Sequence, residues 1–171
     1  MTNSEARRAR GLLVAAVTLL VTWAAAGVVN ANQFLMGNVP SATGVVVSLM
    51  AVCIWPVVGW FAGSQSGTGF LRLATAFWAT VVVGTPLVAW AFSSAPGLTV
   101  MQGGFVLPLL LFALAAPLYG LVALLPTWDP FAWETILWTV VIGVSVFGVT
   151  LSAYLVQRRR TRRRATGAGP G

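Results

Sequence analysis

Two carboxylic acids lie close together in the C-terminal third of the chain. Asp129 and Glu134 belong to the segment Trp-Asp-Pro-Phe-Ala-Trp-Glu at 128–134, and Glu5 is the only other acidic residue. Two carboxylates at a membrane surface could act as general acid and general base on a lipidic substrate. The same residues also fit an ordinary turn and helix start, with Glu134 complementing the helix dipole. Because no nucleophile, further base or metal ligand converges on the segment, we expect no catalysis there.

Most other reactive side chains are missing from the sequence. The chain contains no histidine and a single cysteine, Cys53. Without imidazole there is no histidine metal ligand and no Ser-His or Cys-His catalytic pair. A lone cysteine forms no intrachain disulfide, CxxC pair or four-ligand zinc site. Cys53 lies within an apolar run, so we expect a buried, inert thiol, and the sequence predicts no cofactor and no metal.

The composition is that of an integral membrane protein. Of the 171 residues, 58% are apolar and only 8% are charged, whereas about 25% of the residues in a soluble domain are charged. The ten basic residues are all arginines and give a net charge of +7. Ionisable groups inside membrane spans mark proton relays and ion paths. All the charged residues here fall outside the apolar stretches, so a proton- or ion-coupled pump is not expected.

Five apolar stretches are each long enough to cross about 30 Å of hydrocarbon, which takes about 20 helical residues. The predicted spans are Gly11–Val29, Gly44–Gly63, Leu73–Phe92, Phe105–Leu125 and Thr135–Val156. They leave a basic head at 1–10, connectors of which the longest is the loop Asn30–Thr43, and an arginine-rich tail at 157–171 that we expect to be disordered. The first stretch exceeds the about 7–15 apolar residues of a signal peptide and is predicted to be an uncleaved helix. The predicted fold is an all-α, polytopic transmembrane bundle of about five spans with short loops.

Small residues recur at four-residue spacing within these stretches. Such spacing places them on one face of a helix, where they let a second helix backbone approach closely. The clearest members are Gly59, Gly63, Ala76, Thr80, Gly84, Gly148 and Ser152. These faces fit packing inside the bundle and docking onto another membrane subunit or a second copy of the chain about equally well.

The tail begins directly after the last predicted span. Its basic residues are Arg158, Arg159, Arg160, Arg162, Arg163 and Arg164. Arginines at this position attract anionic lipid headgroups, each by about 1 kcal/mol. Nucleic-acid binding is not expected, because the tail has no folded module and no interleaved aromatic side chains. Membrane lipids are therefore its predicted partners.

The arginines raise a conflict about orientation. Basic segments favour the cytoplasmic side, but five crossings put the head and the tail on opposite sides. An even number of crossings would place all ten arginines on one side, if Leu98–Leu125 formed a re-entrant hairpin shielded by other helices. Insertion in both orientations is a third alternative. We retain five spans and expect the tail on the cytoplasmic side of the cell membrane, because six clustered charges are the harder set to translocate.

Three functions are compatible with these features. We expect a non-catalytic accessory or scaffold subunit of a larger membrane complex, because the chain combines small-residue faces with missing reactive groups and no soluble domain. The second is a small transporter or permease component for a neutral or apolar solute, with proline-kinked helices as its moving parts. The third is an interfacial lipid-modifying enzyme that uses Asp129 and Glu134.

Overall fold

The computed structural model describes residues 3–65, 68–94, 106–122, 124–125 and 132–167. Its regular elements are five helices: α1 (Asn3–Met36), α2 (Ala42–Gly63), α3 (Gly69–Ser94), α4 (Val106–Val122) and α5 (Trp133–Gly167). No strand occurs within these ranges. The predicted all-α bundle of about five apolar helices is confirmed. Four of the described helices, α1, α2, α3 and α5, are long and apolar enough to cross a membrane.

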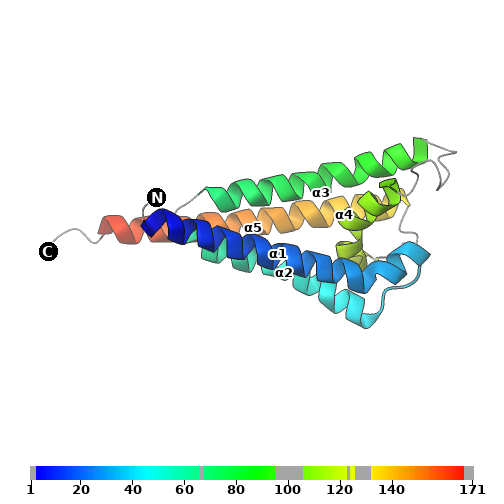
Figure 1. Cartoon of the computed structure of the whole chain (residues 1–171), viewed down its shortest axis with the longest axis horizontal. Helices are drawn as coiled ribbons and strands as arrows, with labels where there is room; N and C mark the ends of the chain where they lie inside the picture. The colour runs from blue at the N-terminus through cyan, green and yellow to red at the C-terminus, as the bar shows by residue number, and fades with distance from the viewer. Residues whose placement is uncertain (1–2, 66–67, 95–105, 123, 126–131, 168–171) are drawn as a thin grey trace.

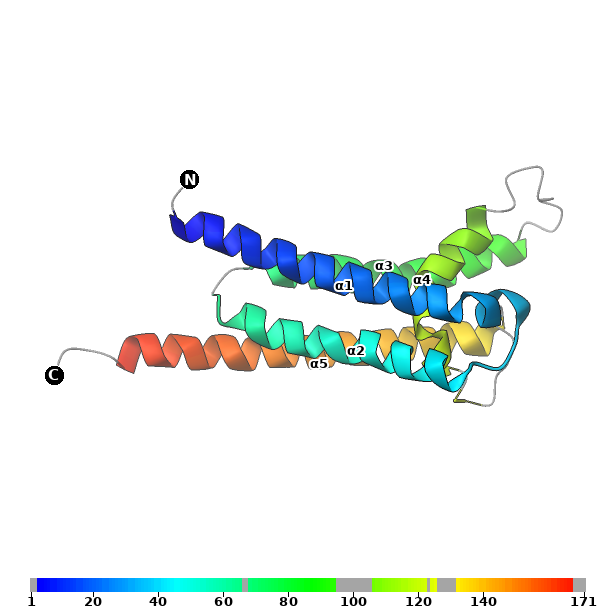
Figure 2. The same ribbon diagram turned by 60° about the horizontal axis from the view of Figure 1, so that its bottom comes forward.

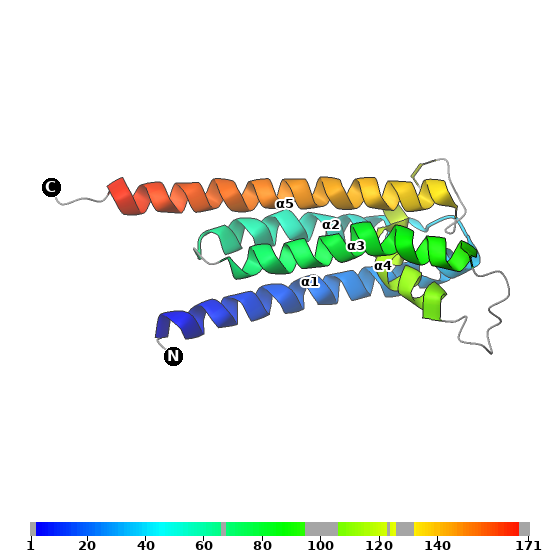
Figure 3. The same cartoon turned by 90° about the horizontal axis from the view of Figure 1, so that it is seen from above.

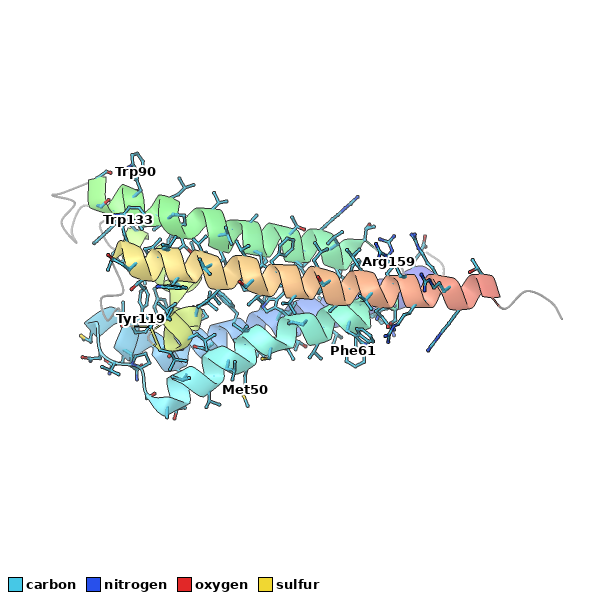
Figure 4. The ribbon with its side chains drawn as sticks, turned by 180° about the vertical axis from the view of Figure 1, so that it is seen from behind. Met50, Phe61, Trp90, Tyr119, Trp133 and Arg159 are labelled. Carbon is cyan, nitrogen blue, oxygen red and sulfur yellow. The ribbon has the colours of Figure 1, made fainter. Side chains whose placement is uncertain are left out.

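The four long helices run side by side and alternate in direction along the bundle (Figure 1). As a result, both chain ends lie at the same end of the bundle, as Figure 3 also shows. We call this end, with Arg10, Arg72 and the arginines of 158–164, the arginine end. Figure 4 shows Arg159 and Phe61 toward it, and Trp90 and Trp133 at the opposite end, where exposed indoles suit a headgroup region.

The short helix α4 lies at the end opposite the termini, which we call the α4 end (Figures 1 and 3). Its 17 residues measure about 25 Å at 1.5 Å per residue, less than the about 30 Å of a hydrocarbon core. It packs against α1, α2 and α3 and less extensively against α5, whereas α1 and α3 contact each other little. Helix α4 is therefore a wedge between α1 and α3. The long helices traverse the bundle four times, an even number that brings the described arginines to one end.

The structure differs from the sequence-based expectation chiefly at three helix ends. Helix α1 begins at Asn3, so the described part of the predicted head is helical. Helix α1 continues past Val29 to Met36 and stops at Gly37, whose φ of 64° is the left-handed conformation that glycine supplies at helix ends. Helix α5 continues through Gly167, so residues 157–167 are helical rather than disordered. Arginine is a good helix former, and cations stabilise the negative end of the helix dipole.

Aromatic rings hold the middle of the bundle together. Trp23 of α1, Trp55 of α2, and Phe77 and Trp78 of α3 form a cluster whose ring centroids are 4.6 to 5.8 Å apart. Lipid tails are as apolar as leucine, so burial in a membrane gives little drive for helix association and close packing must supply it. This cluster ties three of the four long helices at one level.

Candidate functional site

Two of the predicted small residues pack inside the bundle. Gly59 and Gly63 of α2 are buried and face α5. A Cβ atom added to Gly59 would lie 3.0 Å from the Thr150 carbonyl oxygen, and one added to Gly63 would lie 2.6 Å from that of Tyr154. These glycines therefore let the backbones of α2 and α5 approach closely.

The predicted stripe on α3 divides between two surroundings. Gly84 faces α4, since an added Cβ would lie 3.2 Å from a methyl carbon of Leu114. Ala76 and Thr80 are exposed on the outer side of the helix. The Thr80 hydroxyl donates a hydrogen bond of 2.8 Å to the Ala76 carbonyl, which satisfies it within its own helix.

The small residues of α5 face outward. Gly148 and Ser152 are exposed, and a Cβ added to Gly148 would meet no atom within 4 Å. Ser145, which the sequence analysis did not select, is exposed beside them and donates to the Val141 carbonyl at 2.8 Å. Its three-residue spacing to Gly148 was the signal available in the sequence. We call Ser145, Gly148 and Ser152 the outer α5 face.

The carboxylates proposed for catalysis are not brought together with other reactive groups. Glu134 is exposed in the first turn of α5, and Asp129 lies outside the described residues. Within the described ranges, no cluster of three His, Cys, Asp or Glu residues could hold a metal ion. The prediction that Cys53 is buried is wrong, because its side chain is exposed on α2; the apolar run around it is a membrane-length helix, and such a helix also has apolar residues on its outer side.

The arginines of the predicted tail form the last turns of α5. Arg158 lies over the Tyr154 ring at 5.9 Å, and Arg160 over the Trp60 ring at 5.1 Å. Such cation–π contacts hold a guanidinium beside an aromatic face. The remaining four are exposed: Arg159, Arg162, Arg163 and Arg164. These side chains are thus free to meet anionic groups at the surface of a membrane.

A buried polar contact that sequence reasoning missed joins α1 to α2 at the α4 end. Asn30, predicted as the start of a connector, is fully buried in α1. Its amide nitrogen donates to the Ala26 carbonyl and to the Ser48 hydroxyl, both at 2.9 Å. On α4, a Cβ added to Gly120 would lie 2.6 Å from the Ser48 hydroxyl oxygen. The four-residue spacing from Ala26 to Asn30 was the available signal, because an asparagine can bond the carbonyl one helical turn earlier.

A second contact, between α1 and α4, compensates for the hydrogen bond that Pro117 removes from α4. A proline has no backbone N–H, so the carbonyl four residues earlier, that of Ala113, loses its usual donor. The indole nitrogen of Trp23 donates to that carbonyl at 3.0 Å. A neighbouring helix thus satisfies the backbone group freed by a proline, as a membrane environment requires.

The arginine end contains a groove. Figure 2 shows α1 and α2 separating toward the termini, and a cavity of about 640 Å³ lies there between α1, α2 and the start of α3. Apolar side chains make most of its wall, including Leu12, Val58 and Phe70, while Arg10 and Gln65 are its main polar groups. Its volume is within the about 300–1,000 Å³ of small-molecule sites. The groove is therefore a candidate site for a small ligand.

Comparisons of the chain with protein-family models, with curated proteins and with solved structures found no match.

Proposed function

We propose that the protein is a small multi-pass membrane protein that acts as a non-catalytic subunit and docks onto a partner helix through the outer α5 face. The observation that carries the proposal is the open space at Gly148, where no atom lies within 4 Å of an added Cβ. Gly59 and Gly63 already pack against another helix of the bundle, whereas Gly148 does not. A close-approach position without an internal partner is what an external helix requires.

The neighbours of Gly148 support this role. Val144, Val149 and Leu155 are exposed on α5 around the outer α5 face. Large side chains beside a line of small ones leave a shallow channel in which a helix backbone fits. The same kind of packing occurs inside the bundle, where α5 approaches α2 closely at Gly59 and Gly63. We propose another membrane subunit as the partner, and a second copy of the chain as the alternative to be tested.

Matched variants test this docking. The assembly is purified in a mild detergent from cells that express Gly148→Leu or Val149→Leu, and its composition is read by mass spectrometry. Gly148→Leu should lose the stoichiometric partner, with an unchanged circular dichroism spectrum, because the leucine enters open space in the isolated bundle. Val149→Leu should keep the partner. The proposal is overturned if the wild-type chain purifies alone as a monomer, or if Gly148→Leu keeps its partner.

One observation favours the transporter alternative. The groove lies at the arginine end, while α4 packs against the long helices at the opposite end (Figure 1), as is expected for a carrier that is open on one side. Within the described residues, the fully buried polar groups are an asparagine, a serine and threonines, and none is charged. An interior without buried charged residues suits a neutral or apolar solute better than an ion. Liposomes that contain only this chain should then show solute flux above protein-free liposomes, and flux equal to the protein-free control would remove this alternative.

We further propose that the arginine end faces the cytoplasm. Arg10, Arg72 and the arginines of α5 lie at that end (Figure 1). Arginines in segments next to spans are retained on the cytoplasmic side, and this arrangement satisfies the rule for all the described arginines at once.

A further inference from the structure

The groove at the arginine end has a polar mouth and an apolar body. Along α1, the residues that line it pass from Arg10 through Leu12 and Ala15 to Thr18, in the direction that runs from the termini toward the middle of the bundle (Figure 2). A phospholipid in the adjoining leaflet has the same order, with its headgroup outermost and its acyl chains deeper. The groove therefore fits the direction in which a lipid lies.

The mouth of the groove carries donors. Arg10 is exposed and lines the cavity, and its guanidinium presents five N–H donors. The Gln65 carboxamide lies directly over Gly11, because a Cβ added to Gly11 would meet its oxygen at 2.5 Å and its nitrogen at 2.8 Å. Glycine at 11 thus leaves room for an amide beside Arg10. Both groups can donate to phosphate oxygens, and Arg–phosphate contacts are among the stronger hydrogen bonds.

The positive charge of the arginine end favours an anionic headgroup. Glu5 is the acidic residue described near the termini, and Glu134 lies in the first turn of α5 at the α4 end. The end that contains Glu5 also contains Arg10, Arg72 and the arginines of α5. Its net charge is therefore positive. A zwitterionic headgroup brings no net charge to this field, whereas an anionic one is attracted by each nearby arginine.

The body of the groove requires an apolar occupant. Its wall is built from Val14 and Ala15 of α1, Val58 and Ala62 of α2, and Phe70 of α3. These apolar side chains form no hydrogen bonds with water, but they can pack against the methylene chain of a lipid. We propose that the groove binds one anionic phospholipid, with an acyl chain between α1 and α2 and the phosphate at Arg10 and Gln65. This inference goes beyond the proposed subunit role and does not depend on it.

The test counts bound lipids by native mass spectrometry of the full chain released from detergent that contains phosphatidylglycerol or phosphatidylcholine. The wild-type chain should retain one phosphatidylglycerol, at least fivefold more strongly than phosphatidylcholine. Arg10→Gln should weaken retention of phosphatidylglycerol about fivefold, the effect of one arginine near a headgroup. Arg162→Gln removes an equal charge from the exposed end of α5 and should leave retention unchanged.

A second pair of variants tests the body of the groove. Val14 and Leu13 are both exposed on α1, but only Val14 lines the groove. Val14→Trp should abolish retention of both lipids, while Leu13→Trp should leave it unchanged, and the circular dichroism spectra of both should match the wild type. Equal losses in Arg10→Gln and Arg162→Gln would overturn the proposal in favour of diffuse charge attraction. A change of oligomeric state in Val14→Trp, with lipid retention unaltered, would overturn it in favour of a helix in the groove.

Discussion

The two ends of the bundle hold α1 in different ways. At the α4 end, Asn30 donates to Ser48 of α2, and from the middle of the bundle Trp23 donates to the Ala113 carbonyl of α4. At the arginine end, α1 separates from α2, and the groove lies between them (Figure 2). Few satisfied buried contacts mean a low local free energy of opening. The comparison indicates that the α4 end stabilises the fold and that the arginine end is open to a ligand.

The length of α4 explains the difference. Helix α4 separates α1 from α3 where it lies, and it has only 17 residues. It therefore lies among the long helices only toward the end opposite the termini (Figures 1 and 3). Toward the arginine end no fifth helix lies among them, and the groove is lined by α1, α2 and the start of α3 instead. Because α4 is short, it lies among the long helices at one end of the bundle only, and the groove lies at the other end.

The largest expected effect comes from adding the same methyl group at each end. In Gly120→Ala, the Cβ would lie 2.6 Å from the Ser48 hydroxyl oxygen and meet the Gly44 carbonyl, so the backbone of α2 must shift. We expect a loss of about 3 kcal/mol in the free energy of unfolding, measured by denaturation in detergent micelles.

Gly11→Ala is the matched control at the arginine end. The three atoms nearest to its Cβ would all belong to the Gln65 side chain, which is exposed and can turn away. We expect no loss, and a gain of up to about 1 kcal/mol from the better helix propensity of alanine. Equal destabilisation by the two variants would contradict the difference between the ends.

A smaller effect is expected from the indole that compensates for Pro117. Trp23→Phe removes the donor to the Ala113 carbonyl, whereas in a Pro117→Ala background the new backbone N–H supplies one. The free energy of unfolding lost through Trp23→Phe should therefore be about 1.5 kcal/mol less in the Pro117→Ala background. Additive effects in this double-mutant cycle would show that the hydrogen bond contributes nothing to the free energy of unfolding.

The smallest effect concerns the buried amide. Asn30→Ala removes the hydrogen bond to Ser48 and should cost about 1 kcal/mol, within the range of polar contacts between membrane helices. Gln65→Ala removes an exposed amide at the arginine end and should change the free energy of unfolding by less than about 0.5 kcal/mol. A larger loss in Gln65→Ala than in Asn30→Ala, in the same denaturation experiment, would reverse the assignment of stability to the α4 end.

The sequence predicts the class of fold and part of the packing. Apolar stretches of membrane length predict the helices, and four-residue spacing predicts the close approach at Gly59 and Gly63. It does not predict Asn30, because a polar residue beyond about 20 apolar ones is typical of a connector, and only the position of Ser48 on α2 makes it an internal contact. It does not place Gly63 inside and Gly148 outside either, since both have the same local pattern and only the neighbouring helices distinguish them.

The length of α4 is also not predicted by the hydropathy of the sequence. Phe105–Leu125 is apolar enough for a span, and α4 ends at Val122. Its buried residues run continuously from Ala115 to Gly120, which is the pattern of a helix surrounded by others rather than one with a lipid-facing side. The conflict among the arginines pointed to the same segment, because a Leu98–Leu125 that does not cross the membrane would place all the arginines on one side.

The central claim, that the long helices bring both termini to one side of the membrane, is tested most directly by cysteine labelling in intact cells. Cys53→Ser provides a background without cysteine. Single substitutions Ala9→Cys, Thr166→Cys and Asn38→Cys then report the head, the tail and the α1–α2 loop, all at exposed positions. We predict that a membrane-impermeant maleimide modifies only the chain with Asn38→Cys. Modification of one terminus but not the other would contradict the account.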